Sequence, residues 1–162
     1  MPTLIETVSI RAPIERCFDL ARSIDFHEDA ARSIRAKAVG GKTRGLSGAG
    51  DSTCWQATFF GLSFRLTTRI QDFTPSVSFS DVMTQGLFKN FSHHYRFTIQ
   101  DDRTQLEDRF VFESPLGFLS GLLDRGLLLK PMRRAQNERL RAIKFALENG
   151  EADKYLDRPN VT

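Results

Sequence analysis

The sequence predicts an α+β protein in which a curved antiparallel sheet of about seven strands surrounds one long C-terminal helix. Short segments of alternating apolar and polar residues recur between residues 34 and 112, separated by glycine, proline and polar turns. Two short helical segments follow the first strand. The only long helical apolar repeat lies near the C-terminus, so this segment alone can cover the apolar face of the sheet.

The first strand and the two short helices open the chain. Residues 3–11 alternate between apolar and polar side chains, which is typical of a half-buried strand. Pro13 suits the first helical position, where an amide hydrogen has no partner within the helix. We expect this helix to reach about Arg22 and a second one to cover residues 25–31.

Six further strands are expected after the helices. The glycine-rich stretch Gly40–Gly50 is expected to be a turn that follows the first of them. The six strands fall at residues 34–39, 53–59, 62–70, 77–81, 91–99 and 104–112.

The last two strands form a hairpin that brings polar groups to the inner face. Alternation places five residues on one face of the first strand, namely Phe91, His93, Tyr95, Phe97 and Ile99. The polar stretch 100–103 closes the hairpin. If Ile99 pairs with Thr104, then Tyr95 lies opposite Asp108 and His93 lies diagonal to Asp108. A buried carboxylate needs a partner, so this cluster is either a satisfied part of the core or the polar end of a cavity.

The C-terminal part is predicted to be helical. Pro131 predicts a helix start or kink, with a break near residues 125–130. One apolar stripe follows along Met132, Ala135, Leu140, Ile143 and Leu147. Gly150 is a plausible stop. We therefore expect one domain over residues 1–150 and a C-terminal tail over residues 151–162.

Composition limits the class of protein. The chain has 162 residues, fourteen phenylalanines, one tryptophan and a net charge of +3. This mild charge does not indicate nucleic-acid binding. The two cysteines fit neither a disulfide framework nor a zinc spacing, and no apolar signal segment begins the chain, so a cytoplasmic location is expected. The most apolar run, residues 116–129, is too short to span a bilayer, and we find no cofactor motif and no metal-ligand spacing.

The order of elements resembles that of the SRPBCC superfamily, which includes START lipid-transfer domains, birch-pollen-allergen-like proteins and polyketide cyclases. The resemblance extends over residues 4–148 and is closest to small bacterial ligand-binding members. The residues that carry it include Ala12-Pro13, Ser23-Ile24-Asp25-Phe26-His27, Gly45-Leu46, Gly50, Trp55, Phe60-Gly61, Phe79, Asp81, Gly86-Leu87-Phe88-Lys89, Phe91, His93, Phe97, Thr104, Asp108 and Ser114-Pro115-Leu116-Gly117. It implies a START-like helix-grip fold with an internal cavity for an apolar or amphipathic small molecule.

We expect the cavity to be lined by apolar and polar residues from the sheet and the long helix. The candidates are Trp55, Phe59, Phe64, Leu66, Phe79, Asp81, Phe91, His93, Tyr95, Asp108, Phe110 and Met132. His27 is expected to be a surface or capping residue near the cavity mouth. The polar cluster has three open interpretations: bracing the core, orienting a ligand, or acid–base catalysis.

The expected function is binding or carriage of a hydrophobic or amphipathic small molecule, lipid-like or polyketide-like, without catalysis or a cofactor. One alternative is a cyclase or dehydratase with His93 as base and Asp108 orienting it. Another is an interaction module that uses the basic face of the long helix, which carries Arg133, Arg134, Arg141 and Lys144.

Overall fold

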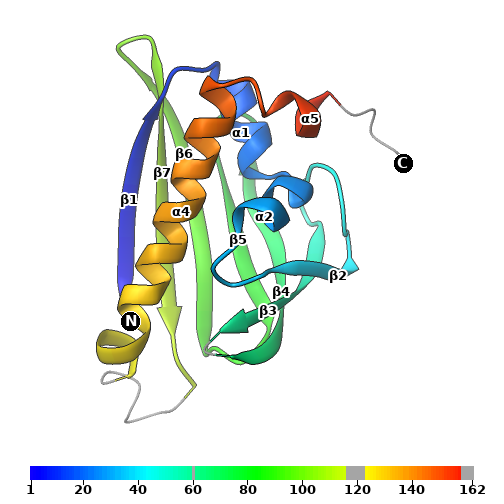
Figure 1. The fold of residues 1–162 in the computed structure, drawn as a ribbon, viewed down its shortest axis with the longest axis vertical. Coiled ribbons are helices and arrows are strands. Elements are labelled where there is room, and N and C mark those ends of the chain that lie inside the picture. The colour runs from blue at the N-terminus through cyan, green and yellow to red at the C-terminus, as the bar shows by residue number, and fades with distance from the viewer. Residues whose placement is uncertain (60, 116–122, 158–162) are drawn as a thin grey trace.

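A computed structural model describes residues 1–59, 61–115 and 123–157, without the side chains of Phe59 and residues 123–125. The strands are β1 (Thr3–Ile10), β2 (Lys37–Gly41), β3 (Ser52–Phe59), β4 (Leu62–Thr74), β5 (Ser78–Gln85), β6 (Asn90–Gln100) and β7 (Arg103–Glu113). The helices are α1 (Ile14–Ala21), α2 (Ile24–Ala30), the π-helix η2 (Leu123–Leu128), α4 (Leu129–Glu148) and α5 (Asp153–Leu156) (Figure 1).

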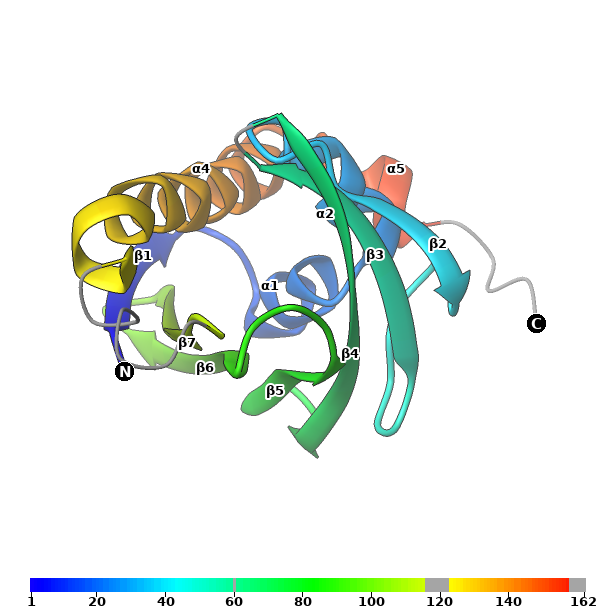
Figure 2. The same cartoon turned by 90° about the horizontal axis from the view of Figure 1, so that it is seen from below.

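The seven strands form one antiparallel sheet that curves around α4. Their order is β1-β7-β6-β5-β4-β3-β2. Figure 2 shows the sheet bending from β1 to β2, with α1, α2 and α4 on its concave side. Register shifts in β4 and β2 accompany this curvature, as bulges locally increase twist. The predicted fold class is confirmed.

The strand β2 ends at a position that requires glycine. Gly41 has a positive φ of 66°, and a Cβ there would collide with the carbonyl oxygen of Ser52 on β3. The strand therefore runs to Gly41, into the stretch that the sequence assigned to a turn, because the absence of a side chain lets the two backbones approach.

The β6–β7 hairpin has the predicted register. Ile99 pairs with Thr104 and Tyr95 with Asp108. Ile99 itself was expected to face the interior, and this is wrong, because 69% of its surface is exposed. The segment between β1 and α1 covers Thr104, whose hydroxyl donates to the carbonyl of Ala12 at 2.8 Å, but it leaves Ile99 uncovered.

The helix α4 begins where proline is tolerated. The π-helix η2 runs directly into it, and Pro131 is the third residue of α4, close to this change of helix type. Its buried residues follow the helical repeat and are Met132, Gln136, Leu140, Ile143 and Ala146.

The two halves of α4 face different surroundings. Leu140, Ile143 and Ala146 pack in a continuous core with α1 and the β6–β7 hairpin. Met132, by contrast, belongs to a smaller cluster with Phe110 of β7. A third cluster contains Trp55 of β3 and Leu66 of β4, and the N-terminal half of α4 lines one space together with these two residues.

Residues 151–157 form more than the tail that the sequence predicted. They include α5, and Ala152 and Tyr155 belong to the main core. The hydroxyl of Tyr155 donates to Asp29 Oδ2 at 2.6 Å, and its ring meets the edge of Phe26. A four-residue helix carries too little periodicity to be recognised from the sequence.

Candidate functional site

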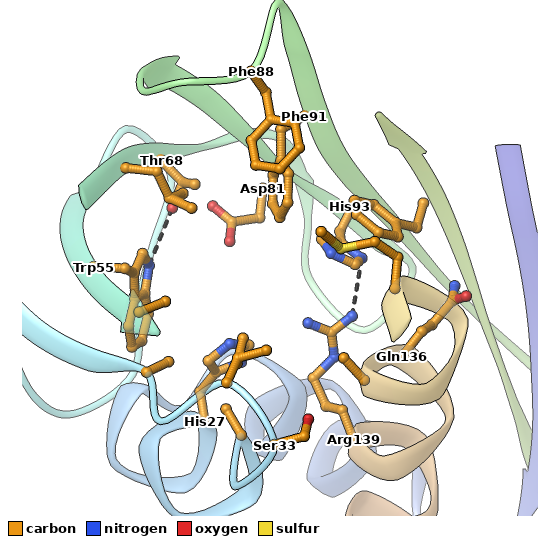
Figure 3. A pocket seen from close by; sticks show the side chains of 18 of the residues that line it. His27, Ser33, Trp55, Thr68, Asp81, Phe88, Phe91, His93, Gln136 and Arg139 are labelled. Carbon is orange, nitrogen blue, oxygen red and sulfur yellow. Dashed lines mark hydrogen bonds between the residues drawn. The ribbon is translucent and has the colours of Figure 1, made fainter. Parts of the chain in front are cut away.

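A cavity of about 80 Å³ lies between the sheet and the N-terminal half of α4. Figure 3 shows its walls, which come from α2, the segment before β2, strands β3 to β7 and α4. The lining residues are His27, Ala31, Ser33, Ile34, Ala36, Trp55, Ala57, Phe64, Leu66, Thr68, Asp81, Phe88, Phe91, His93, Phe110, Met132, Ala135, Gln136 and Arg139. Most are apolar, and four carry ionisable groups.

Most of the predicted cavity residues line this space. They are Trp55, Phe64, Leu66, Asp81, Phe91, His93, Phe110 and Met132. Strand alternation explains this outcome, because every second residue of a strand faces the concave side of the sheet. Phe59 was also predicted, and its side chain lies outside the described residues.

Three predicted residues lie next to the cavity and do not line it. Phe79 and Tyr95 are packed in the main core with Phe97, and they border a small adjacent void of about 30 Å³. Asp108 is fully buried behind His93. Alternation gave the correct face for all three, but it does not show how far the core extends along that face.

A buried triad of polar residues closes one side of the cavity. His93 Nδ1 lies 2.9 Å from Asp108 Oδ1, and the guanidinium Nη2 of Arg139 donates to Asp108 Oδ2 at 2.6 Å. The ring of Phe110 stacks on His93 with a centroid distance of 4.0 Å. Gln136 adds a bond from its Nε2 to the backbone oxygen of Asp108 at 2.8 Å. The carboxylate thus receives the partners that its burial requires.

The protonation of His93 follows from these contacts. Its Nδ1 lies 2.9 Å from both Asp108 Oδ1 and Arg139 Nη2 (Figure 3), and one ring nitrogen cannot both donate and accept. A lone pair facing the carboxylate would be repulsive, so we assign Nδ1–H as the donor to Asp108, which leaves Nε2 as an acceptor. Burial lowers the pKa of His93 to about 4, against the opposing effect of Asp108. The imidazole is therefore neutral at pH 7.

Asp108 is the anion of the triad. Burial alone would raise the pKa of this carboxyl, but His93 and Arg139 outweigh burial and lower it to about 2. The pair of Asp108 and Arg139 is therefore an ion pair with no net charge.

Next to the triad, β5 carries a second carboxyl group, that of Asp81. Trp55 Nε1 donates to Thr68 Oγ1 at 3.3 Å (Figure 3), and Asp81 lines the cavity beside Thr68. Burial raises the pKa of Asp81, although Thr68 and Arg139 oppose this effect. Asp81 pairs with His93 across β5 and β6.

His27 is a wall residue and not a capping residue. The cap of α2 is Ser23, whose Oγ accepts from the amide of Phe26 at 3.3 Å. His27 lies one helical turn further on, with its ring 4.8 Å from that of Trp55. Burial lowers its pKa to about 3, and Arg139 acts in the same direction.

Comparison with known proteins identifies the fold. No protein-family model and no curated protein matches the sequence. Among solved structures, TTHA0849 from Thermus thermophilus matches with a TM-score of 0.75 and 18% identity, over 92% of this chain and 99% of that one. A START superfamily protein from Mycobacterium smegmatis matches with a TM-score of 0.65 and 16% identity, over 91% and 97%. The protein Ara h 8.0201 matches with a TM-score of 0.67 and 12% identity, over 91% of this chain and 98% of that one.

The chain has the helix-grip fold. The expected likeness to the SRPBCC superfamily is thus confirmed as a likeness of fold.

Arg139 is the main site residue that sequence reasoning missed. It lies three residues after Gln136 and four before Ile143, so helical spacing places it on the buried stripe. Its charge concealed this position, because arginine is normally assigned to the solvated face of a helix. The sequence pattern that could have revealed Arg139 is a positively charged residue on the apolar face of the C-terminal helix, which is the face that covers the strand with Asp108.

Two further observations describe the helix-grip structure. Within residues 1–59, 61–115 and 123–157, no group of three or more histidine, cysteine, aspartate or glutamate side chains could hold a metal ion. No helix in the described part of the chain is long and apolar enough to cross a membrane.

Proposed function

We propose that this protein binds a small amphipathic molecule in the cavity between its sheet and α4. The observation that carries the proposal is the composition of the cavity wall. Aromatic and aliphatic side chains form most of it, while Asp81, His93 and Arg139 converge on it. Binding sites for small molecules commonly combine an apolar wall with a few polar groups that orient the ligand.

The cavity size limits the ligand. Its volume of about 80 Å³ is below the roughly 150 Å³ of an engineered apolar cavity that binds benzene. A ligand larger than one ring therefore requires the wall to move. Phe88 and Phe91 are the natural candidates, because both are only partly buried and their rings contact each other at 5.3 Å. We propose the loop between β5 and β6 as the gate.

Two measurements test this proposal. Native mass spectrometry of protein purified without detergent, followed by organic extraction, should detect a bound species of defined mass. Trp55 is the only tryptophan and lines the cavity, so its fluorescence should change when N-phenyl-1-naphthylamine binds.

A matched pair of variants locates the binding. Ala135→Leu adds bulk inside the cavity, whereas Ala142→Leu adds the same bulk on the same helix outside it. Ala135→Leu should weaken binding of the naphthylamine at least tenfold and Ala142→Leu should leave it unchanged. Equal effects of the two substitutions, or no fluorescence change at all, would contradict the proposal.

A second candidate function is acid–base catalysis on a polyketide-like substrate. The contact of 2.9 Å between His93 Nδ1 and Asp108 supports it, because a neutral imidazole held in this way offers Nε2 as a general base. His93→Gln should then abolish turnover and retain binding. Retained turnover in this variant would exclude His93 as the base.

The interaction-module alternative rests on the basic face of α4. Part of that charge is paired, since Arg134 contacts Glu138 at 2.8 Å and Arg133 lies 3.7 Å from Glu6. A partner protein that binds equally well to the Ala135→Leu variant would favour this alternative.

A further inference from the structure

Arg139 has hydrogen-bonding capacity that the protein does not use. Its Nη2 contacts Asp108 and His93, but Nη1 and the buried Nε have no hydrogen-bond partner among the described residues. Only 12% of the side chain is exposed. Leaving the buried Nε of Arg139 without a hydrogen-bond partner costs the folded protein roughly 1–3 kcal/mol. Figure 3 shows the second terminal nitrogen of Arg139 directed into the cavity, away from His93.

The surroundings of this donor favour an oxygen anion over a cation. A guanidinium group matches the planar geometry of a carboxylate, and such charge-assisted bonds are stronger than neutral ones. The ring of Tyr95 lies 5.4 Å from the Arg139 guanidinium carbon and supports the positive charge from the core side. The imidazoles of His27 and His93 are neutral, so neither competes with Arg139 for an anion.

Asp81 is the carboxyl group of the cavity lining that could repel an anion. It faces the cavity across from Arg139 (Figure 3), and its burial raises the pKa of its carboxyl group above the ordinary value. If Asp81 takes up a proton when a carboxylate binds, it becomes a hydrogen-bond donor and can hold the second oxygen of a carboxylate that Arg139 binds at the first.

Building on the proposed function, we infer that the ligand is an organic acid whose carboxylate binds Arg139 Nη1 while its apolar body lies against Trp55, Phe64 and Phe91. A carboxylate arriving beside Asp81 stabilises the protonated form of that residue, so binding takes up a proton. The groups around this proton are His27 of α2, Asp81 of β5, His93 of β6, Asp108 of β7 and Arg139 of α4.

Three probes with one ring system separate this inference from the proposed function. Naphthalene-2-carboxylate carries the anion, 2-methylnaphthalene is neutral, and naphthalen-2-ylmethylammonium carries a cation. Their dissociation constants are measured from the fluorescence of Trp55 at pH 7. We expect the carboxylate to bind about tenfold more tightly than the neutral probe, the effect of one charge-assisted bond. Calorimetry in two buffers of different ionisation enthalpy should show proton uptake for the carboxylate alone.

The matched variant removes the ion pair as a unit. Asp108→Asn combined with Arg139→Met leaves no buried charge without a partner, and circular dichroism checks that it folds. It should bind the carboxylate and the neutral probe equally. A second variant, Arg139→Lys, keeps the charge without the planar fork and should lose part of the preference.

The outcomes are distinct. Binding of the neutral probe with no preference for the carboxylate, or a preference for the cation, overturns the organic-acid inference and leaves the proposed function intact. Failure of all three probes to bind overturns both. Unchanged preference in the double variant shows that Arg139 is not the recognition group.

Discussion

Replacing Arg139 by methionine should destabilise the protein strongly, because it leaves the carboxylate of Asp108 buried without a cation. Asp108 is 0% exposed, and Arg139 Nη2 is its charged partner at 2.6 Å. Removing one member of a buried ion pair typically costs about 3–5 kcal/mol. Asp108 keeps the hydrogen bond from His93, so we expect a value near the lower end, about 3 kcal/mol.

Urea unfolding at pH 7, followed by circular dichroism, measures this loss. With a slope of about 2 kcal/mol per M, a loss of about 3 kcal/mol lowers the midpoint by about 1.5 M. Asp108→Asn alone should cost about 2–3 kcal/mol, because it leaves Arg139 as a buried cation without its counterion. The double substitution removes both charges and should cost only about 1 kcal/mol.

The control is Arg134→Met on the same helix. The side chain of Arg134 is 77% exposed and pairs with Glu138 at the surface, so the loss should stay below about 0.5 kcal/mol. The reasoning is refuted if the losses of the two single substitutions simply add in the double variant, because additivity would mean that the two charges do not interact.

Three further predictions concern other parts of the molecule. The folded protein resists protonation of His27 and His93, whose pKa values of about 3 and about 4 lie below the ordinary 6.5, so the unfolded chain binds more protons between these limits. The free energy of unfolding should therefore fall as pH decreases from about 6.5 to about 4, and changing either residue to glutamine should flatten this slope in urea titrations. Gly41→Ala should lower stability by about 1–3 kcal/mol, because a side chain there meets a carbonyl of β3 at a positive φ, and an unchanged thermal midpoint would contradict this. Tyr155→Phe should cost about 1 kcal/mol by removing the bond to Asp29, whereas a loss below the error of denaturant titration would show that the bond contributes nothing.

The hairpin shows why so much of the fold could be predicted. Its register follows from the turn at residues 100–103 and from an alternation that any slip by one residue would invert. That register alone placed His93 beside Asp108, and the contact of 2.9 Å confirms it. The alternation of side chains and the residues of the turn were sufficient to predict this register, because the two strands follow each other directly in the sequence.

The site residues that the sequence did not place correctly depend on contacts between elements that are distant in the chain. Arg139 and Asp108 are thirty-one residues apart in the sequence. No local sequence pattern shows which positively charged side chain pairs with a buried carboxylate. Whether Phe79 and Tyr95 fill the core or line the cavity depends on how far α1 extends over the sheet, since Phe18 packs against Phe79. His27 was misjudged for the same reason, because its neighbour Trp55 comes from another element.

The division of α4 into a core half and a cavity half has a consequence for how this chain can change. Leu140, Ile143 and Ala146 hold the helix against α1 and the hairpin, so substitutions there affect folding first. Met132 and Ala135 border the cavity near one end of the same helix, and substitutions there alter the shape offered to a guest molecule. A library confined to the first two turns of α4 could therefore redirect selectivity while the rest of the helix preserves the scaffold. The same polypeptide could in this way be developed into a family of single-tryptophan sensors, each read out by Trp55.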